Sequence, residues 1–153
     1  MCHLMKLVRV ATVGTILLYV ATASAETADQ AAVARLLHRT FDRPDAALLV
    51  APVVVSGSHA VAGWTQGETG GRALLRKKDR DWVLILCAGD AIRSEDGLVI
   101  AGVPRTDAAS LASDLISEEA KLPAQQVAMF SRFEGIMTME GGGDRAPASP
   151  GGH

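Results

Sequence analysis

The sequence predicts an α+β domain in which an N-terminal helix precedes a four-stranded antiparallel meander and two to three C-terminal helices. Apolar residues recur with helical spacing before Pro44. Four strand-like segments follow between residues 47 and 87, separated by short turns of Gly, Ser and Asp. Helical spacing returns after Gly89. Because connections this short favour antiparallel neighbours, we expect a meander with helices before and after it.

The first element is an amphipathic helix over residues 28–40. Its apolar positions are Ala32, Val33, Leu36 and Leu37. Asp29 is available as its N-cap, and the helix ends before Pro44. His38 and Arg39 then fall in the last turn, where positive charge suits the helix dipole, so a structural role is expected for His38.

The four strands are expected at residues 47–55, 59–66, 72–77 and 81–87. Pro52 has no backbone N–H to donate, so the first strand is expected at an edge of the sheet. The last strand is apolar on both faces and is therefore covered on both. One face carries Val83 and Ile85, and the other carries Trp82, Leu84 and Leu86. We expect helices on one face, and a partner subunit or the C-terminal segment on the other.

Two or three helices are expected after the sheet. Asp90 can cap a short helix that runs toward Ala101 and stops at Gly102. Pro123 opens the last helix, since proline is common at a first helical position. Thr106 can cap the helix between them, whose apolar positions are Ala109, Leu111, Ala112, Leu115 and Ile116. This order of elements is analogous to cystatin-like and NTF2-like folds.

Residues 1–25 have the pattern of a secretory signal peptide. A lightly basic start leads into an apolar run, residues 10–20, and then into the A-x-A cleavage site Ala23-Ser24-Ala25. The run is too short for a transmembrane helix, which needs ~20 apolar residues. We expect cleavage before Glu26, export to the periplasm, and no membrane span after cleavage. A single domain is expected over residues 26–140, and a disordered Gly/Pro-rich tail over residues 141–153.

The charge balance argues against nucleic acid as a partner. After residue 25 the chain has 13 Lys and Arg residues against 17 Asp and Glu residues. Phosphate backbones are bound by surfaces rich in Lys and Arg, whereas acidic residues are in excess here.

Cys87 is the only cysteine after residue 25, so no intramolecular disulfide is expected. The thiol is buried in the last strand, ligates a metal or pairs between two chains; burial is favoured, because free cysteine is often buried. A Cys-dependent hydrolase would combine Cys87 with His59 and Asp90, and it is the least favoured hypothesis, because Asp90 already serves as a helix cap.

Met137 and Met139 place two thioethers on one face if their segment is extended. Thioether and thiolate ligands favour Cu(I), and Met129, Cys87 and His59 could add to such a site if the fold brings them close; Met129 would otherwise pack in the core on a helix. The alternative is that both methionines pack in a terminal strand against the sheet. Copper, as Cu(I), is the metal cofactor that these residues could bind.

The motifs of the chain resemble those of a small bacterial family, the periplasmic copper uptake system-associated proteins. The resemblance covers residues 28–140. It is carried by Gly63-Trp64-Thr65-Gln66-Gly67, Gly70-Gly71-Arg72-Ala73-Leu74-Leu75, Trp82, Leu86-Cys87-Ala88-Gly89-Asp90, Ala101-Gly102-Val103-Pro104 and Phe130-Ser131-Arg132-Phe133-Glu134-Gly135. Family members are exported and encoded among copper-acquisition components, and many end in His-rich tails, whereas this chain ends in Gly151-Gly152-His153.

The resemblance implies a non-enzymatic accessory protein of copper uptake. Cys87 and the paired methionines are positions that the pattern shares. Such a protein would bind copper itself or dock to a copper chaperone or an outer-membrane receptor component, and a homodimer is compatible with it. The alternative is a metal-free module that binds a partner protein through a sheet face. Residues 64–71 would then be either scaffold at the sheet end or a binding rim.

Overall fold

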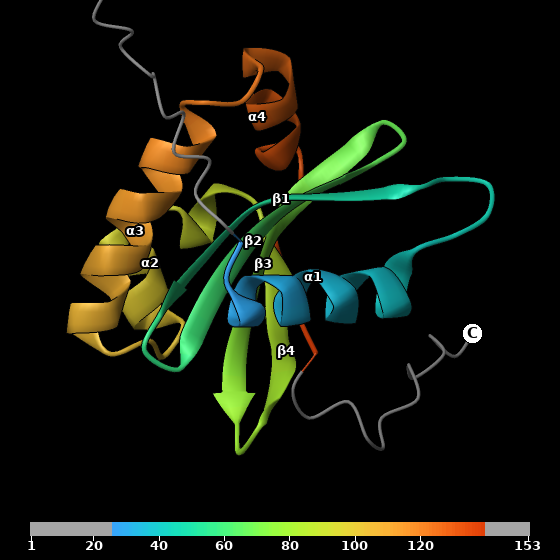
Figure 1. Ribbon diagram of the computed structural model, residues 1–153. Helices are drawn as coiled ribbons and strands as arrows, with labels where there is room; N and C mark the ends of the chain where they lie inside the picture. The colour runs from blue at the N-terminus through green and yellow to red at the C-terminus, as the bar shows by residue number, and fades with distance from the viewer. Residues whose placement is uncertain (1–25, 140–153) are drawn as a thin grey trace, which may run out of the picture.

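The computed structural model describes residues 26–139 and has the expected α+β fold (Figure 1). The expected signal peptide and C-terminal tail lie outside the described residues. In chain order the elements are α1 (Ala28–Phe41), β1 (Leu48–Ser56), β2 (His59–Gln66), β3 (Thr69–Lys78), β4 (Asp81–Ala88), the 3₁₀ turn η1 (Asp90–Ile92), α2 (Glu95–Ile100), α3 (Arg105–Glu119), α4 (Ala124–Phe130) and β5 (Ile136–Thr138). No helix within residues 26–139 is both long and apolar enough to cross a membrane.

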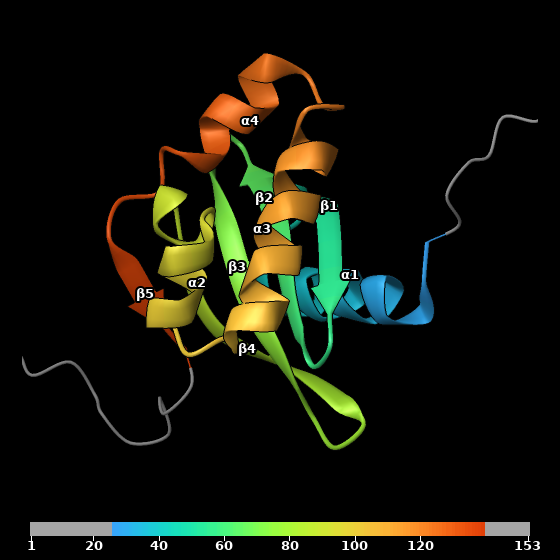
Figure 2. The same cartoon turned by 90° about the vertical axis from the view of Figure 1, so that its left-hand side faces the viewer.

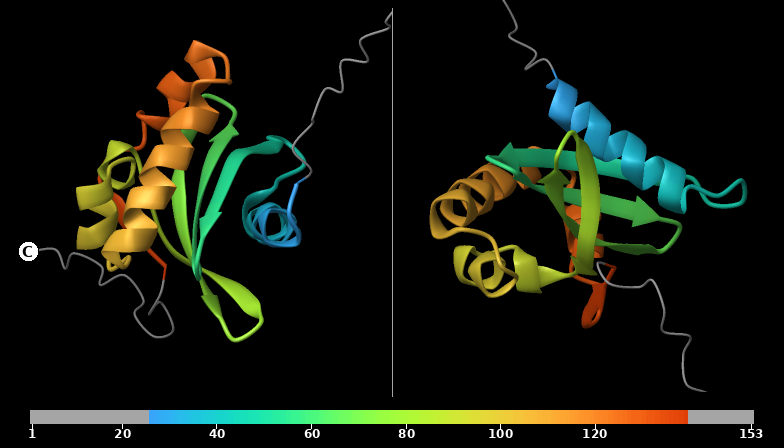
Figure 3. Two further views of the ribbon diagram at one scale, coloured as in Figure 1. Left: turned by 60° about the vertical axis from the view of Figure 1, so that its left-hand side comes forward. Right: turned by 90° about the horizontal axis from the view of Figure 1, so that it is seen from below.

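The strands form one antiparallel sheet in the order β1-β2-β3-β4-β5. The expected meander is confirmed, and the short strand β5 adds to its far edge. Helix α1 covers one face, whereas α2 and α3 cover the other (Figure 3). Helix α4 lies across one end of the sheet on the α3 side (Figure 2).

Alternating side chains divide the core between the two faces of the sheet. Towards α3, Val61 and Leu74 pack with Leu111. Towards α1, Ala73 and Leu75 pack with Val33, Leu37 and Cys87. Both faces are therefore covered within one chain, and α1 supplies the cover that a partner subunit was also expected to provide.

Thr27, not Asp29, is the N-cap of α1. Thr27 and Gln30 form a reciprocal capping box, in which each side chain accepts a hydrogen bond from the other's backbone N–H. The Gln30 amide also donates to the Val53 carbonyl of β1 at 2.7 Å. Asp29 is thereby free to pair with Lys77 at 2.7 Å and to accept a 3.2 Å hydrogen bond from the Trp82 indole. These contacts join the first turn of α1 to the β3–β4 hairpin.

Strand β1 lies at an edge of the sheet, as Pro52 predicts. Its register with β2 shifts between Val50 and Val53, where Ala51 and Pro52 both lie opposite Gly63. A Cβ atom at Gly63 would come within 2.8 Å of both the Ala51 carbonyl oxygen and the Phe130 ring. Glycine is required there because the bulge and α4 approach the same point.

The predicted alternation of β4 is wrong at Leu86. The register against β3 moves from Leu74–Leu86 to Leu75–Leu84, so that Ile85 is the extra residue of a bulge. Ile85 and Leu86 consequently both pack on the α3 side, whereas Trp82 and Leu84 stay on the α1 side. A bulge reverses the alternation of all residues beyond it, and nothing in an unbroken apolar run indicates where it falls.

The region after β4 also differs from expectation. Asp90 does not cap the helix that runs toward Ala101; the chain makes η1 and then α2, whose N-cap is Ser94. The Ala91 carbonyl oxygen would lie only 1.8 Å from a Cβ on Gly97, which explains a glycine inside α2. Gly102 ends α2 with a φ of 96°, as expected.

Helix α3 begins two residues earlier than its expected cap, Thr106, would allow. Pro104, rather than Thr106, precedes the helix, and its side chain makes no capping hydrogen bond. Two expected core positions, Ala109 and Ile116, are exposed. The buried stripe instead includes Ala108 and Glu119. Leu111, Ala112 and Leu115 are buried as expected, and the charged Glu119 is the member of the stripe that apolar residues alone could not indicate.

A buried ion pair joins β3 to α3. The side chain of Arg72 is fully buried, and its Nε and Nη2 donate to the two carboxylate oxygens of Glu119 at 2.7 and 3.1 Å. Its Nη1 donates to the Gly89 carbonyl at 3.2 Å and to Asp90 at 2.9 Å. The Phe130 ring lies 5.4 Å from the guanidinium carbon. The Arg72 side chain thus connects β3 to α3, to the segment after β4 and to α4.

We expect Glu119→Gln to lower the free energy of unfolding by about 3 kcal/mol, because a buried charge that loses its partner keeps its desolvation cost. The matched control is Glu118→Gln, the adjacent residue, whose ion pair with Lys121 is solvent-exposed. That change should cost less than about 1 kcal/mol. Urea unfolding followed by circular dichroism measures both, and equal losses would contradict a special role for the buried pair.

Candidate soft-metal site

The antiparallel register pairs Cys87 of β4 with Met137 of β5. Side chains of register partners lie on the same face of a sheet, with Cβ atoms about 4.5–5.5 Å apart. Met137 is 54 % exposed, whereas Cys87 is 5 % exposed. The pair therefore places one shielded sulfur and one accessible sulfur side by side at the β5 edge.

Cys87 lies at the α1 face, among the apolar side chains that surround Val33 and Leu37. Burial raises the pKa of the Cys87 thiol to about 11, because the low-polarity surroundings disfavour the thiolate. The thiol is neutral at ordinary pH, and its burial is as predicted. A metal that binds there must displace the proton.

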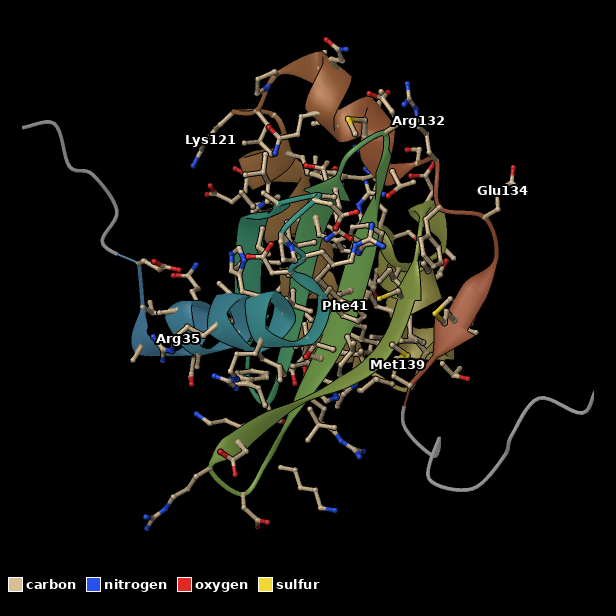
Figure 4. All side chains as sticks on the ribbon, turned by 90° about the vertical axis from the view of Figure 1, so that its right-hand side faces the viewer. Arg35, Phe41, Lys121, Arg132, Glu134 and Met139 are labelled. Atoms are coloured by element: carbon tan, nitrogen blue, oxygen red, sulfur yellow. The ribbon has the colours of Figure 1, made fainter. Side chains whose placement is uncertain are left out.

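Met139 continues the pairing of β5 with β4. Its backbone N–H donates to the Ile85 carbonyl at 2.7 Å, one residue beyond the last residue of the strand. Figure 4 places Met139 at the end of β5, beside β4. The expectation of a terminal strand at Met137 and Met139 is met, and Met137 is nevertheless too exposed to serve mainly as core.

His59 lies on the other face of the sheet. It alternates with Val61 on the α3 side, where its Nδ1 is 3.8 Å from Asp107 of α3. Burial lowers the pKa of His59, and nearby Arg76 lowers it further, while Asp107 opposes both effects. Through Arg76 of β3, His59 is in register with Val83 of β4. Val83 precedes Cys87 by four residues, which is about 13 Å along the strand. The structure does not bring His59 to the two sulfur ligands.

His59 instead belongs to a small polar cluster between β2 and α3. Asp107 accepts a 3.2 Å hydrogen bond from the Ser56 hydroxyl. The Nδ1 atom of His59 is buried and has no hydrogen-bond partner among the described residues. Asp107 also fills the space beside Gly57, where a Cβ would approach its carboxylate within 2.7 Å. The cluster fixes the β1–β2 turn against the start of α3.

The grouping of Cys87, His59 and Asp90 that a hydrolase would need is not assembled. Asp90 accepts hydrogen bonds from Ser131 at 2.7 Å and from Arg72 at 2.9 Å. These two bonds, with that from Ser131 the stronger influence, lower the pKa of Asp90. His59 and Cys87 lie on opposite faces of the sheet, so neither can orient the other.

Residues 64–71 form the β2–β3 end of the sheet. The Trp64 ring makes an edge-to-face contact with Phe133, with centroids 5.9 Å apart. A Cβ on Gly71 would come within 3.0 Å of the Trp64 ring and 3.1 Å of Phe133. Trp64 therefore packs over the sheet end, which is the scaffold role expected of it.

Sequence reasoning missed Glu119 and the network around Arg72. The signal was present, because Glu119 follows Leu111 and Leu115 at the same helical spacing and so continues their stripe. Within residues 26–139, no three His, Cys, Asp or Glu side chains gather as a group that could hold a metal ion. Sulfur from methionine is thus the additional donor that a site at Cys87 would need.

We expect Cys87 to react with iodoacetamide at least about a hundredfold more slowly in native protein than in denaturant. The raised pKa alone lowers the thiolate fraction by roughly that factor, and burial slows access further. Peptide mass spectrometry measures labelling at Cys87 separately from Cys2. Similar rates in the two states, or a covalent dimer on non-reducing gels, would contradict a buried thiol.

Comparison of the chain with protein-family models, with curated proteins and with solved structures found no match in any of the three.

Proposed function

We propose that this protein is a non-enzymatic periplasmic accessory protein of copper uptake that binds Cu(I) between β4 and β5. The observation that carries the proposal is the register partnership of Cys87 with Met137. The two sulfurs come from residues far apart in the sequence, and only strand pairing brings them together. The resemblance to copper uptake system-associated proteins supports the choice of metal.

The donor set fits a soft monovalent ion. Thiolate and thioether sulfur are preferred by Cu(I) over the harder divalent ions. Cys87 and Met137 would hold the ion, and Met139, two residues further along the same segment, is the candidate third ligand. His59 is not part of this proposal, because it lies on the α3 face.

The location suits transfer of the ion to another protein. Strand β5 is the outer strand of the sheet, and the Met137 side chain is half exposed there. A copper chaperone or an outer-membrane receptor component could reach the ion from that edge. The buried thiol would hold the ion from the inner side, and the exposed thioether would be the ligand that exchanges first.

We expect Met137→Leu with Met139→Leu to weaken Cu(I) binding at least about tenfold while the fold is kept, because Leu and Met have similar volumes. Anaerobic titration of the Cys2→Ser chain against a competing chelator measures the affinity. Met129→Leu, a change in α4, is the matched control and should leave the affinity unchanged. Absence of Cu(I) binding, or equal affinity in all three chains, would contradict the proposal.

The pH dependence of the same titration tests the thiol. Because Cys87 has a pKa of about 11, each bound ion releases one proton, and the apparent affinity should rise about tenfold per pH unit near neutrality. Cys87→Ser should weaken binding and remove this slope. Binding by the wild-type chain with no pH dependence would place the ion on thioethers alone and would contradict the role of Cys87.

A further inference from the structure

Arginine side chains from two elements line one groove beside α1. Arg35 and Arg39 are one turn apart on α1, and Arg80 comes from the β3–β4 turn. With Leu36, Asp81 and Trp82 they border a cavity of about 390 Å³, which we name the arginine groove. Figure 4 places Arg35 on α1 above the β3–β4 hairpin.

These arginines lack the ion pairs that most other cations of the domain make. Arg72, Lys77, Arg93, Arg105 and Lys121, for example, each lie within 3.0 Å of a carboxylate oxygen. Within residues 26–139, Arg35, Arg39 and Arg80 have no carboxylate within 4.0 Å, although Asp81 borders the same groove. Unpaired positive charge is therefore concentrated at one place on an otherwise acidic chain.

The floor of the groove is fixed before any ligand arrives. Trp82 is 7 % exposed, and its indole N–H donates to Asp29 at 3.2 Å. The same Asp29 oxygen pairs with Lys77, whose Nζ lies 5.7 Å from the centre of the Trp82 ring. These contacts hold the hairpin against α1, so binding does not have to order the two walls.

We propose that the arginine groove is a docking site for an acidic linear segment of a partner protein. Guanidinium groups bind carboxylates through paired hydrogen bonds, and three of them along one groove match a segment that carries several Asp or Glu residues. Leu36 and Trp82 give the floor apolar surface for the side chains between those acids. This inference is independent of the copper site, because none of the groove residues is a candidate copper ligand.

A lipid surface fits the groove less well. Membrane-bound helices insert exposed aromatic and aliphatic side chains beside their cations. Here the aromatic residue is buried and hydrogen-bonded, and the cations line a concave surface. A flat bilayer could not reach the floor, whereas an extended peptide could.

The test uses a fluorescein-labelled peptide in which Glu alternates with Leu, and measures binding to the full chain by fluorescence anisotropy. We expect saturable binding that the double change Arg35→Gln with Arg39→Gln weakens at least about tenfold, and that Arg80→Gln weakens as well. The matched control removes two exposed arginines outside the groove, Arg43→Gln with Arg105→Gln, and should change the affinity less than about twofold. All five arginines are exposed, so equal urea midpoints can be verified for all variants.

Three outcomes would overturn the proposal. One is no binding of the Glu-Leu peptide up to about 1 mM, or equal binding of a peptide with Gln in place of Glu. Another is equal weakening by the groove variant and the control variant, which would indicate non-specific charge attraction. The last is binding of phosphatidylglycerol vesicles that depends on the groove arginines while the peptide does not bind, which would make a lipid surface the occupant.

Discussion

The arrangement of this domain depends on one buried charge. Arg72 lies in the middle of the sheet's α3 face, where an unpaired guanidinium would be strongly destabilising. Its five N–H donors need partners, and the chain supplies them from the end of α3, from the Gly89 carbonyl and from Asp90. The end of α3 and the backbone at Gly89 and Asp90 are thereby held in place relative to β3. An apolar residue at position 72 could fill the space, but it would impose no such geometry.

The same network explains why the chain after β4 does not continue as one long helix. Asp90 is held by Arg72 and by Ser131, so the backbone there must stay near both. Arg93 in turn donates to the second Glu119 oxygen at 3.0 Å. A 3₁₀ turn satisfies these contacts, and α2 begins only after Ser94. The polar contacts decide the path here, and the apolar residues of α2 then pack into the space that is left.

The spacing of apolar residues was sufficient to predict the order of the helices and of the first four strands, because turn residues such as Gly and Pro separate most of these elements. It did not decide on β5, which was expected only as one alternative for Met137 and Met139, since a three-residue strand after Gly135 carries no periodic signal. The two bulges, in β1 and β4, could not be predicted from the sequence either. A pair of residues that faces a single residue on the neighbouring strand has no distinguishing sequence pattern. The Thr27–Gln30 capping box, in contrast, could have been found from its spacing.

The candidate metal site shows a similar division. Cys87 and Met137 could be singled out by their chemistry, but their partnership is a matter of strand register across fifty residues. His59 could be singled out on the same chemical grounds, and the sheet separates it from both. The face that a side chain occupies depends on whether an odd or an even number of residues separates it from a reference position in its strand. A bulge that is not anticipated therefore assigns every later side chain to the wrong face. Chemical type selects the candidates, and only the pairing decides which of them meet.

The bulge and the Gln30 hydrogen bond at the β1 edge affect how this chain behaves at high concentration. An open strand edge is a template for pairing with another molecule, and long, regular edges promote aggregation. Here Pro52 offers no N–H, the bulge beside it interrupts the ladder, and the Gln30 amide occupies the Val53 carbonyl. A foreign strand that approached would find neither a continuous row of donors nor a free acceptor at its centre. Gln30, which completes the capping box in the first turn of α1, therefore also shields the edge of the sheet from pairing with another molecule.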